Sequence, residues 1–166
     1  MKWFIDTEFN ENGKTIELIS IALVNEHGHG YYAISTEFDP AACNDWVKAN
    51  VLTKLGERHP DSDLWKSRSE IAEDVKGLLQ RGGAPEIWGY FSDYDWVAFC
   101  QLFGCMIDLP DGFPMYCLDL KQEMHRLGVA REQLPEQAAN EHNALADAFW
   151  IRSAWLELIK LEEQAT

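Results

Sequence analysis

The chain has 166 residues and 46% of them are hydrophobic, which predicts one folded domain over residues 1–166 and excludes a disordered protein. Its 28 acidic and 14 basic residues give a net charge of −14, which argues against a general nucleic-acid binder, because such proteins neutralise phosphates with Lys and Arg. No apolar run reaches the ~20 residues of a membrane helix. No signal peptide is visible, and the four cysteines form no Cys-x-x-Cys pair, so we expect a cytoplasmic protein without zinc or disulfides.

The start of the chain predicts three strands. Runs of hydrophobic residues over 2–9, 15–24 and 31–35 favour strands, and turn-forming residues at 10–13 and 27–30 separate them. Because the connections are short, we expect the three strands to form an antiparallel meander.

Helical spacing of hydrophobic residues dominates the rest of the chain. Ser67 and Glu70 fit a capping box at the start of one helix, and Gly128 fits the end of another. We expect helices at 39–51, 67–82, 94–103, 117–127 and 143–163, a strand at 86–90 and a polar loop at 130–141. This order predicts an α/β fold, with a mixed central sheet of three antiparallel strands plus parallel strands, flanked by helices.

Two carboxylates lie close together on the first predicted strand. Asp6 and Glu8 are two positions apart, so their side chains share one face of the strand. The strand is otherwise rich in Trp, Phe and Ile, and burying an unpaired carboxylate there is costly. The pair must therefore reach solvent, a basic partner or a metal ion.

Three further residues are candidates for the same chemistry. His142 stands just before the last predicted helix, which Asn143 can cap, and Asp147 falls about one turn into that helix. Asp95 follows the strand at 86–90, a place where α/β proteins often carry active-site groups, with Asp93 as its rival. Ordinary alternatives are a loop histidine for His142 and helix-terminal carboxylates, favoured by the helix dipole, for the two aspartates.

Together these residues match the needs of two-metal phosphodiester hydrolysis. Two hard divalent cations, roughly 3.5–4 Å apart, need oxygen ligands and open positions for water and phosphate. A histidine that titrates near neutrality can take a proton from the attacking water.

The combination also resembles a known superfamily. Asp6-Thr7-Glu8-Phe9, then Tyr94-Asp95, then His142 with Asp147 five positions later, resemble the three motifs of the DEDDh, or DnaQ-like, exonucleases. The resemblance implies an RNase H-like fold and a 3′–5′ exonuclease. It further implies that Asp6, Glu8, Asp95 and Asp147 bind two Mg²⁺ ions, with Mn²⁺ as an alternative, and that His142 is the general base. Asp95 is preferred to Asp93 because an aromatic residue precedes the motif aspartate in this superfamily.

Within that superfamily, the chain is similar along its length to the polyadenylate-specific exoribonuclease branch called RNase AS. The likeness is carried by residues 6–9, 16–21, 31–40, 64–68 and 94–102. It implies release of nucleoside 5′-monophosphates from the 3′ ends of adenylate-rich single-stranded RNA, and a homodimer. The resemblance also marks Phe9, Glu17 and Ser20 as candidate substrate-binding residues, although core packing for Phe9 and ordinary strand roles for Glu17 and Ser20 are alternatives. Phe91 stands where many DEDDh enzymes carry Asn.

Three other functions compete with this hypothesis. A DNA-directed 3′–5′ exonuclease would use the same metal site, and only a contact to the 2′-hydroxyl would separate the two. A non-catalytic interaction module on the same scaffold would have lost one of the five residues, and all five are present. A calcium-binding protein is disfavoured because no EF-hand loop is present.

Overall fold

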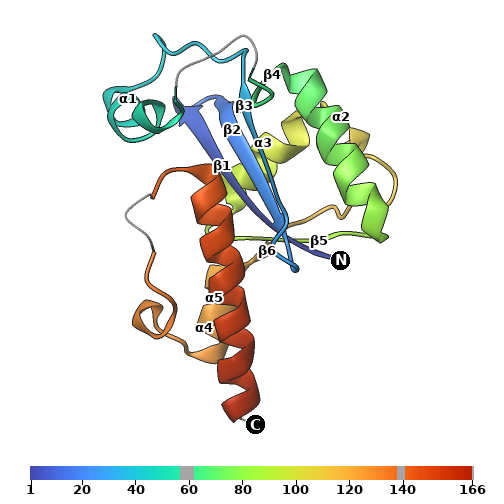
Figure 1. Cartoon of the computed structure of the whole chain (residues 1–166), viewed down its shortest axis with the longest axis vertical. Coiled ribbons are helices and arrows are strands. Elements are labelled where there is room, and N and C mark those ends of the chain that lie inside the picture. Colours follow the sequence, from blue (N-terminus) through green and yellow to red (C-terminus); the bar gives the residue numbers. More distant parts are fainter. Residues whose placement is uncertain (57–61, 138–140, 166) are drawn as a thin grey trace.

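The protein is described from a computed structural model, which covers residues 1–56, 62–137 and 141–165. A six-stranded sheet in the order β4-β3-β2-β1-β5-β6 forms its centre. The strands are β1 (Lys2–Glu11), β2 (Ile16–Asn25), β3 (Gly30–Ser35), β4 (Trp65–Lys66), β5 (Glu86–Gly89) and β6 (Leu118–Asp119). The helices are α1 (Asp45–Asn50), α2 (Arg68–Leu79), α3 (Asp93–Gln101), α4 (Leu120–Leu127) and α5 (Ala144–Ala165) (Figure 1).

The sheet is mixed, as the sequence predicts. Strands β1, β2 and β3 form the expected antiparallel meander, whereas β1 with β5, β5 with β6, and β3 with β4 pair in parallel. The long strand β1 is interior, between β2 and β5, and the carboxyl end of β5 lies beside the segment of β1 that leads into Asp6. The predicted α/β class with a mixed sheet is therefore confirmed.

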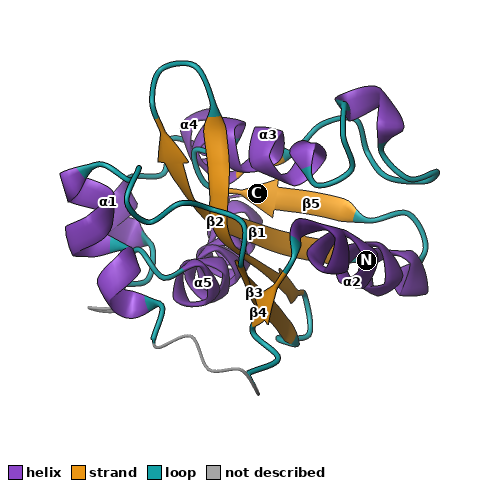
Figure 2. Ribbon diagram, turned by 90° about the horizontal axis from the view of Figure 1, so that it is seen from above, coloured by secondary structure: helices purple, strands orange, loops and turns teal. Residues whose placement is uncertain are grey.

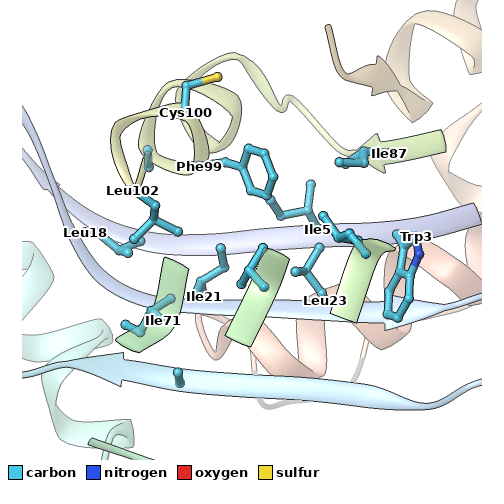
Figure 3. Packing of buried hydrophobic residues seen from close by; sticks show 14 of the residues in the cluster. Trp3, Ile5, Leu18, Ile21, Leu23, Ile71, Ile87, Phe99, Cys100 and Leu102 are labelled. Carbon is cyan, nitrogen blue, oxygen red and sulfur yellow. The ribbon is translucent and has the colours of Figure 1, made fainter. Parts of the chain in front are cut away.

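Helices cover both faces of this sheet. Helices α2 and α5 lie on opposite sides of the strands (Figure 2). On one side, Trp3 and Ile5 of β1 pack with residues of β2, α2 and α3; Figure 3 shows this cluster, including Ile71 and Phe99. On the other side, Phe4 packs with residues of α4 and α5. The alternation of β1 residues between the two clusters follows from the two-residue period of a strand.

Two predicted helices begin later in the structure than the sequence indicates. The helix expected from position 39 begins at Asp45, because Asp39 makes a turn by accepting the amide hydrogens of Ala41 and Ala42, and Asn44 caps the helix instead. The helix expected from position 117 begins at Leu120, after strand β6, and Asp119 caps it. The sequence predicts neither β4 nor β6, because two residues are too few to show a period.

Other boundaries agree with the sequence. Ser67 and Glu70 form the expected capping box of α2, and Gly128 ends α4 in the left-handed conformation, with a φ of 68°. The region expected to be a polar loop at 130–141 contains a short 3₁₀ helix, Arg131–Gln133, and residues 138–140 of it lie outside the described part. In the described part of the chain, no helix is both long and apolar enough to cross a membrane.

The turn from β5 into α3 needs a glycine. A Cβ atom on Gly89 would lie 2.4 Å from the Cβ of Ser92, which is closer than two carbon atoms can approach. Asp119 stabilises the same turn, because its Oδ2 accepts hydrogen bonds from the amide and hydroxyl of Ser92 at 2.8 and 3.1 Å. This tight turn places the first turn of α3 beside the middle of β1, at Thr7.

Candidate active site

Asp6 and Glu8 project from one face of β1, on the side that α5 covers. Glu8 is buried and Asp6 is partly exposed. The pairing of β1 with β2 shifts its register between Glu8 and Phe9, directly after the two carboxylates. Such irregularities often lie next to active sites, where they re-aim side chains.

Asp95 approaches the middle of β1 from the first turn of α3 and is buried. Its Oδ1 accepts hydrogen bonds from the amide and the hydroxyl of Thr7, at 2.8 and 2.7 Å. Strand β5 ends at Gly89, so Asp95 takes the Thr7 amide hydrogen that a longer β5 would have paired. The rival Asp93 is exposed at the start of α3, which favours Asp95 as the functional aspartate.

Asp147 completes the acidic group from the first turn of α5 and is also buried. Asn143 caps this helix as expected, because its Oδ1 accepts a hydrogen bond from the amide of Ala146 at 3.1 Å. Each oxygen of Asp147 has a donor. Gln137 Nε2 donates to Oδ1 at 2.6 Å, and the Asn143 amide donates to Oδ2 at 3.2 Å.

Three of the four carboxylates converge, and the fourth, Asp95, lies near enough to act on two of them electrostatically. Asp6, Glu8 and Asp147 offer ligand oxygens that lie within 4.8 Å of one another. Asp95 belongs to the same electrostatic group, because its charge raises the pKa of both Asp6 and Glu8. These residues come from three separate segments, so only the fold brings them together.

The acidic group is poorly compensated within the protein. Removal from water is the main cause that raises the pKa of Glu8 to about 8, and repulsion from Asp147 and Asp95 adds to it. Burial also raises the pKa of Asp95 to about 6, although the hydrogen bonds from Thr7 oppose the shift. The pKa of Asp6 is raised well above its ordinary value, first by burial and then by its neighbours. Burial likewise raises the pKa of Asp147.

This donor set fits divalent cations. Mg²⁺ and Mn²⁺ prefer carboxylate oxygens, and a buried acidic group with raised pKa values gains most from added positive charge. The raised pKa values thus agree with the convergence of the oxygens, and both point to the same ligands. Asp6, Glu8, Asp95 and Asp147 are the residues that would hold such ions.

His142 lies beside the acidic group and lines the same pocket as Asp6 and Asp147. Its backbone adopts the left-handed region with a φ of 62°, and its ring contacts Trp46 edge-on, with centroids 4.8 Å apart. The pocket has a volume of about 220 Å³ and is lined by Asp6, Tyr90, Gln137, Glu141, His142, Asp147, Trp150 and Ile151. The histidine and two of the four carboxylates therefore face one cavity.

The candidate substrate-binding residues have different surroundings. Phe9 stacks on the exposed ring of Tyr94, with centroids 5.6 Å apart and planes inclined by 16°. Glu17 is partly exposed on β2. Ser20 is fully buried opposite Glu8 in the pairing of β1 with β2, a placement that favours a role behind Glu8 over contact with a base. Phe91, at the position of the usual Asn, is exposed and has a φ of 54°.

Sequence reasoning missed two residues that orient the carboxylates. Thr7 holds Asp95, and Gln137 holds Asp147. Thr7 stands between the two motif carboxylates, so its burial on the opposite face follows from strand alternation, but its partner 88 positions away does not. Gln137 lies in a polar stretch with no pattern of its own.

Comparison with known sequences identifies a matching protein family and a similar relative. Residues 1–159 match the family described as "3'-5' exoribonuclease Rv2179c-like domain". The chain is 45% identical over 150 residues to the 3'-5' exoribonuclease Rv2179c of Mycobacterium tuberculosis strain H37Rv, covering 89% of this chain and 87% of that protein.

Comparison with solved structures confirms the expected RNase H-like fold. The zinc-bound complex of Escherichia coli ExoI with single-stranded DNA matches 99% of this chain with a TM-score of 0.69 and 15% identity. The chain spans 41% of the length of that enzyme. Schizosaccharomyces pombe Pop2p, in a form with bound Mg²⁺ and Mn²⁺, matches 99% of this chain and 85% of its own, with a TM-score of 0.61 and 16% identity.

Proposed function

The chain belongs to the Rv2179c-like family of 3′–5′ exoribonucleases, and from this premise we propose that it trims adenylate-rich single-stranded RNA by a two-metal mechanism. The membership makes the protein a hydrolase. The observation that carries the mechanism is the convergence of Asp6, Glu8 and Asp147, with Asp95 alongside, at one buried point. These four residues are the proposed metal ligands, and His142 is the proposed general base.

Two divalent cations bound by the carboxylates would neutralise the phosphate and stabilise charge on the attacking and leaving oxygens. His142 takes a proton from the attacking water. The water oxygen forms a bond to the terminal phosphorus, and the bond from phosphorus to the 3′ oxygen of the preceding nucleotide breaks. That 3′ oxygen leaves and takes a proton from solvent, and His142 later returns its own proton to solvent, so the products are a nucleoside 5′-monophosphate and an RNA one nucleotide shorter.

Gln137 and Thr7 keep the ligands in place during this reaction. The 2.6 Å hydrogen bond from Gln137 fixes one oxygen of Asp147, and the two hydrogen bonds from Thr7 fix Asp95 against β1. Preorganised ligands need no rearrangement when charge develops in the transition state.

The preference for adenylate rests on the likeness to the RNase AS branch, and aromatic and acidic residues near the site support it. We assign the stacked pair of Phe9 and Tyr94 to the terminal nucleotides, because aromatic rings bind bases by stacking, worth about 1–3 kcal/mol per base. Glu17 is assigned to the amino group of adenine, which can donate a hydrogen bond to a carboxylate. A short 3′ end needs few phosphate contacts, so the net charge of −14 is no obstacle.

A single assay tests the proposal. Oligonucleotides labelled at the 5′ or the 3′ end, made of A, U or deoxy-A, are incubated with and without Mg²⁺. We expect Mg²⁺-dependent shortening from the 3′ end, release of 5′-AMP, and faster cleavage of oligo(A) than of oligo(U) or oligo(dA). Equal rates on all three would remove the adenylate preference. Faster cleavage of DNA would favour the DNA-directed exonuclease. Absence of any cleavage would favour the non-catalytic interaction module.

A further inference from the structure

The segment from α1 to the following 3₁₀ helix, Leu52–Lys54, lies beside the start of α5 (Figure 1). Two contacts join them although the partners are 96 and 87 positions apart in the sequence. The indole of Trp46 meets the imidazole of His142 edge-on at 4.8 Å, and Lys54 Nζ donates a hydrogen bond to the backbone carbonyl of Glu141. We call Trp46 and Lys54 the clamp residues.

The segment that carries the clamp residues is anchored in the core. Val47 and Val51 are buried in a cluster with Ile19 and Ile34 of the sheet. Asn44 caps α1 at one end, with its Oδ1 accepting from the Val47 amide at 2.9 Å. The clamp residues thus stand on a rigid base that the sheet itself positions.

The side chain of Trp46 is not part of the hydrophobic core. It is 55% exposed, although its neighbour Val47 is 4% exposed and faces the sheet. Among the described residues, the aromatic contact of Trp46 is with His142. A large apolar side chain that stays exposed on a short helix and packs on the proposed general base has a use other than stability.

The histidine needs outside support. A φ of 62° is uncommon for residues other than glycine and persists only where the surroundings enforce it. His142 follows Glu141, the residue whose carbonyl Lys54 binds, so Lys54 restrains the backbone on one side while Trp46 restrains the ring. The cap by Asn143 restrains the backbone on the other side.

Lys54 also lies close to the acidic group. Burial dominates the pKa of Glu8 and raises it, and the ammonium of Lys54 opposes that shift. A single cation therefore connects the strand that carries the first carboxylates to the loop that carries the histidine.

We propose that Trp46 and Lys54 are positioning residues that hold His142 in the orientation needed to accept a proton from the attacking water. The kinetic part of this inference rests on the proposed function, whereas the contact itself does not. Positioning predicts a loss in kcat without a change in KM, because substrate binding is left intact. Replacing a residue that contacts RNA directly would instead raise KM.

The test compares four variants with two matched controls. Trp46→Ala and Lys54→Met remove the contacts, and Trp46→Phe and Lys54→Arg keep an aromatic ring or a cation. Tyr116→Ala and Lys160→Met change an exposed aromatic residue and an exposed lysine that lie outside the site. With oligo(A) and Mg²⁺, we expect Trp46→Ala and Lys54→Met to lower kcat about 10–100-fold at unchanged KM. The conservative variants should retain most activity, and the controls all of it.

Two measurements are independent of activity. Nuclear Overhauser contacts between the Trp46 indole and the His142 ring should be present in the metal-free protein and weaken in Lys54→Met. The Mn²⁺ affinity, measured by calorimetry, should not fall in either variant, because the carboxylates are untouched. A raised KM with normal kcat, a lost Mn²⁺ affinity, or parent-like kinetics in both variants would overturn the assignment. If the parent protein cleaves no RNA, the proposed function fails, but the Overhauser contacts still decide whether the clamp exists.

Discussion

The two halves of β1 differ in what they bury: residues 3–5 bury hydrophobic side chains, whereas residues 6–8 bring carboxylates together. Trp3, Phe4 and Ile5 are buried and packed on both faces by helices, so this half stabilises the fold. Asp6 and Glu8 continue the same strand, but their carboxylates are crowded and partly desolvated, with raised pKa values. The comparison shows that hydrophobic packing in the first half offsets the free energy lost by crowding carboxylates in the second.

The largest expected effect comes from the acidic half. Asp6→Asn keeps the size of the side chain and removes one negative charge. We expect kcat/KM on oligo(A) to fall about 10³-fold or more, because a proposed metal ligand is lost. The free energy of unfolding of the metal-free protein should stay equal or rise, since repulsion from Asp95 and Glu8 is relieved. Kinetics and urea denaturation check both parts, and parent-like activity would remove Asp6 from the site.

The apolar half should show the reverse pattern. Ile5 is fully buried in the cluster of β2, α2 and α3. Ile5→Ala should lower the free energy of unfolding by about 2–5 kcal/mol, through lost burial and the cavity left behind. Activity per folded molecule should remain near that of the parent at a temperature where the variant is folded. A large loss of kcat with unchanged stability would break the comparison between the halves.

A smaller effect is expected from the residue that holds Asp147. Gln137→Ala removes the 2.6 Å hydrogen bond to that carboxylate without changing a proposed ligand. We expect a loss of about 10–100-fold in Mn²⁺ affinity, which is typical for residues that orient metal ligands. Calorimetric titration measures it, with Gln122→Ala on the exposed side of α4 as the control. An unchanged affinity would limit Gln137 to a structural role.

The most gradual effect is a dependence of stability on pH. The pKa of Glu8 rises from its ordinary value of 4.5 to about 8 on folding, so the native state holds more protons than the unfolded chain in this interval. Stability contributed by the protonated carboxyl is therefore complete below pH 4.5 and is lost as the pH rises towards 8. The Tm of the metal-free protein should fall over this range, by about 2–4 °C for each kcal/mol lost.

Calorimetry at several pH values tests this dependence. Saturating Mg²⁺ should flatten the decline, because bound cations stabilise the ionised carboxylates. Glu8→Gln should reduce the slope, since it removes a titrating group. An identical slope in Glu8→Gln and the parent would show that other groups cause the decline.

Much of the fold could be predicted because its signals are local. The strands of the meander, the capping box at Ser67 and the end of α4 at Gly128 each follow from short patterns. The start of α1 was missed because Asp39 and Asn44 are both good helix-capping residues, and only tertiary contacts choose between them. Asn10 contributes to that choice, because it bonds the backbone of Ala42 and Asn44.

For the site too, some features follow from local sequence patterns and others depend on tertiary contacts. The sequence singles out the carboxylates and His142 as candidates because their residue types and order carry a signature. The sequence does not reveal that Thr7 holds Asp95 or that Trp46 touches His142, since these contacts join segments 88 and 96 positions apart and depend on how the helices pack. Ser20 illustrates the opposite error: the sequence suggests that it could contact a base, but in the structure its side chain is fully buried.

The hydrogen bonds to Asp95 limit how that residue can coordinate a cation. Both Thr7 donors use Oδ1, and a carboxylate oxygen has two lone pairs, so that oxygen is saturated. Asp95 can then offer only Oδ2 and is restricted to monodentate coordination. A monodentate ligand leaves more of the coordination sphere to water and phosphate oxygens, which is the arrangement that rapid exchange of substrate and product requires.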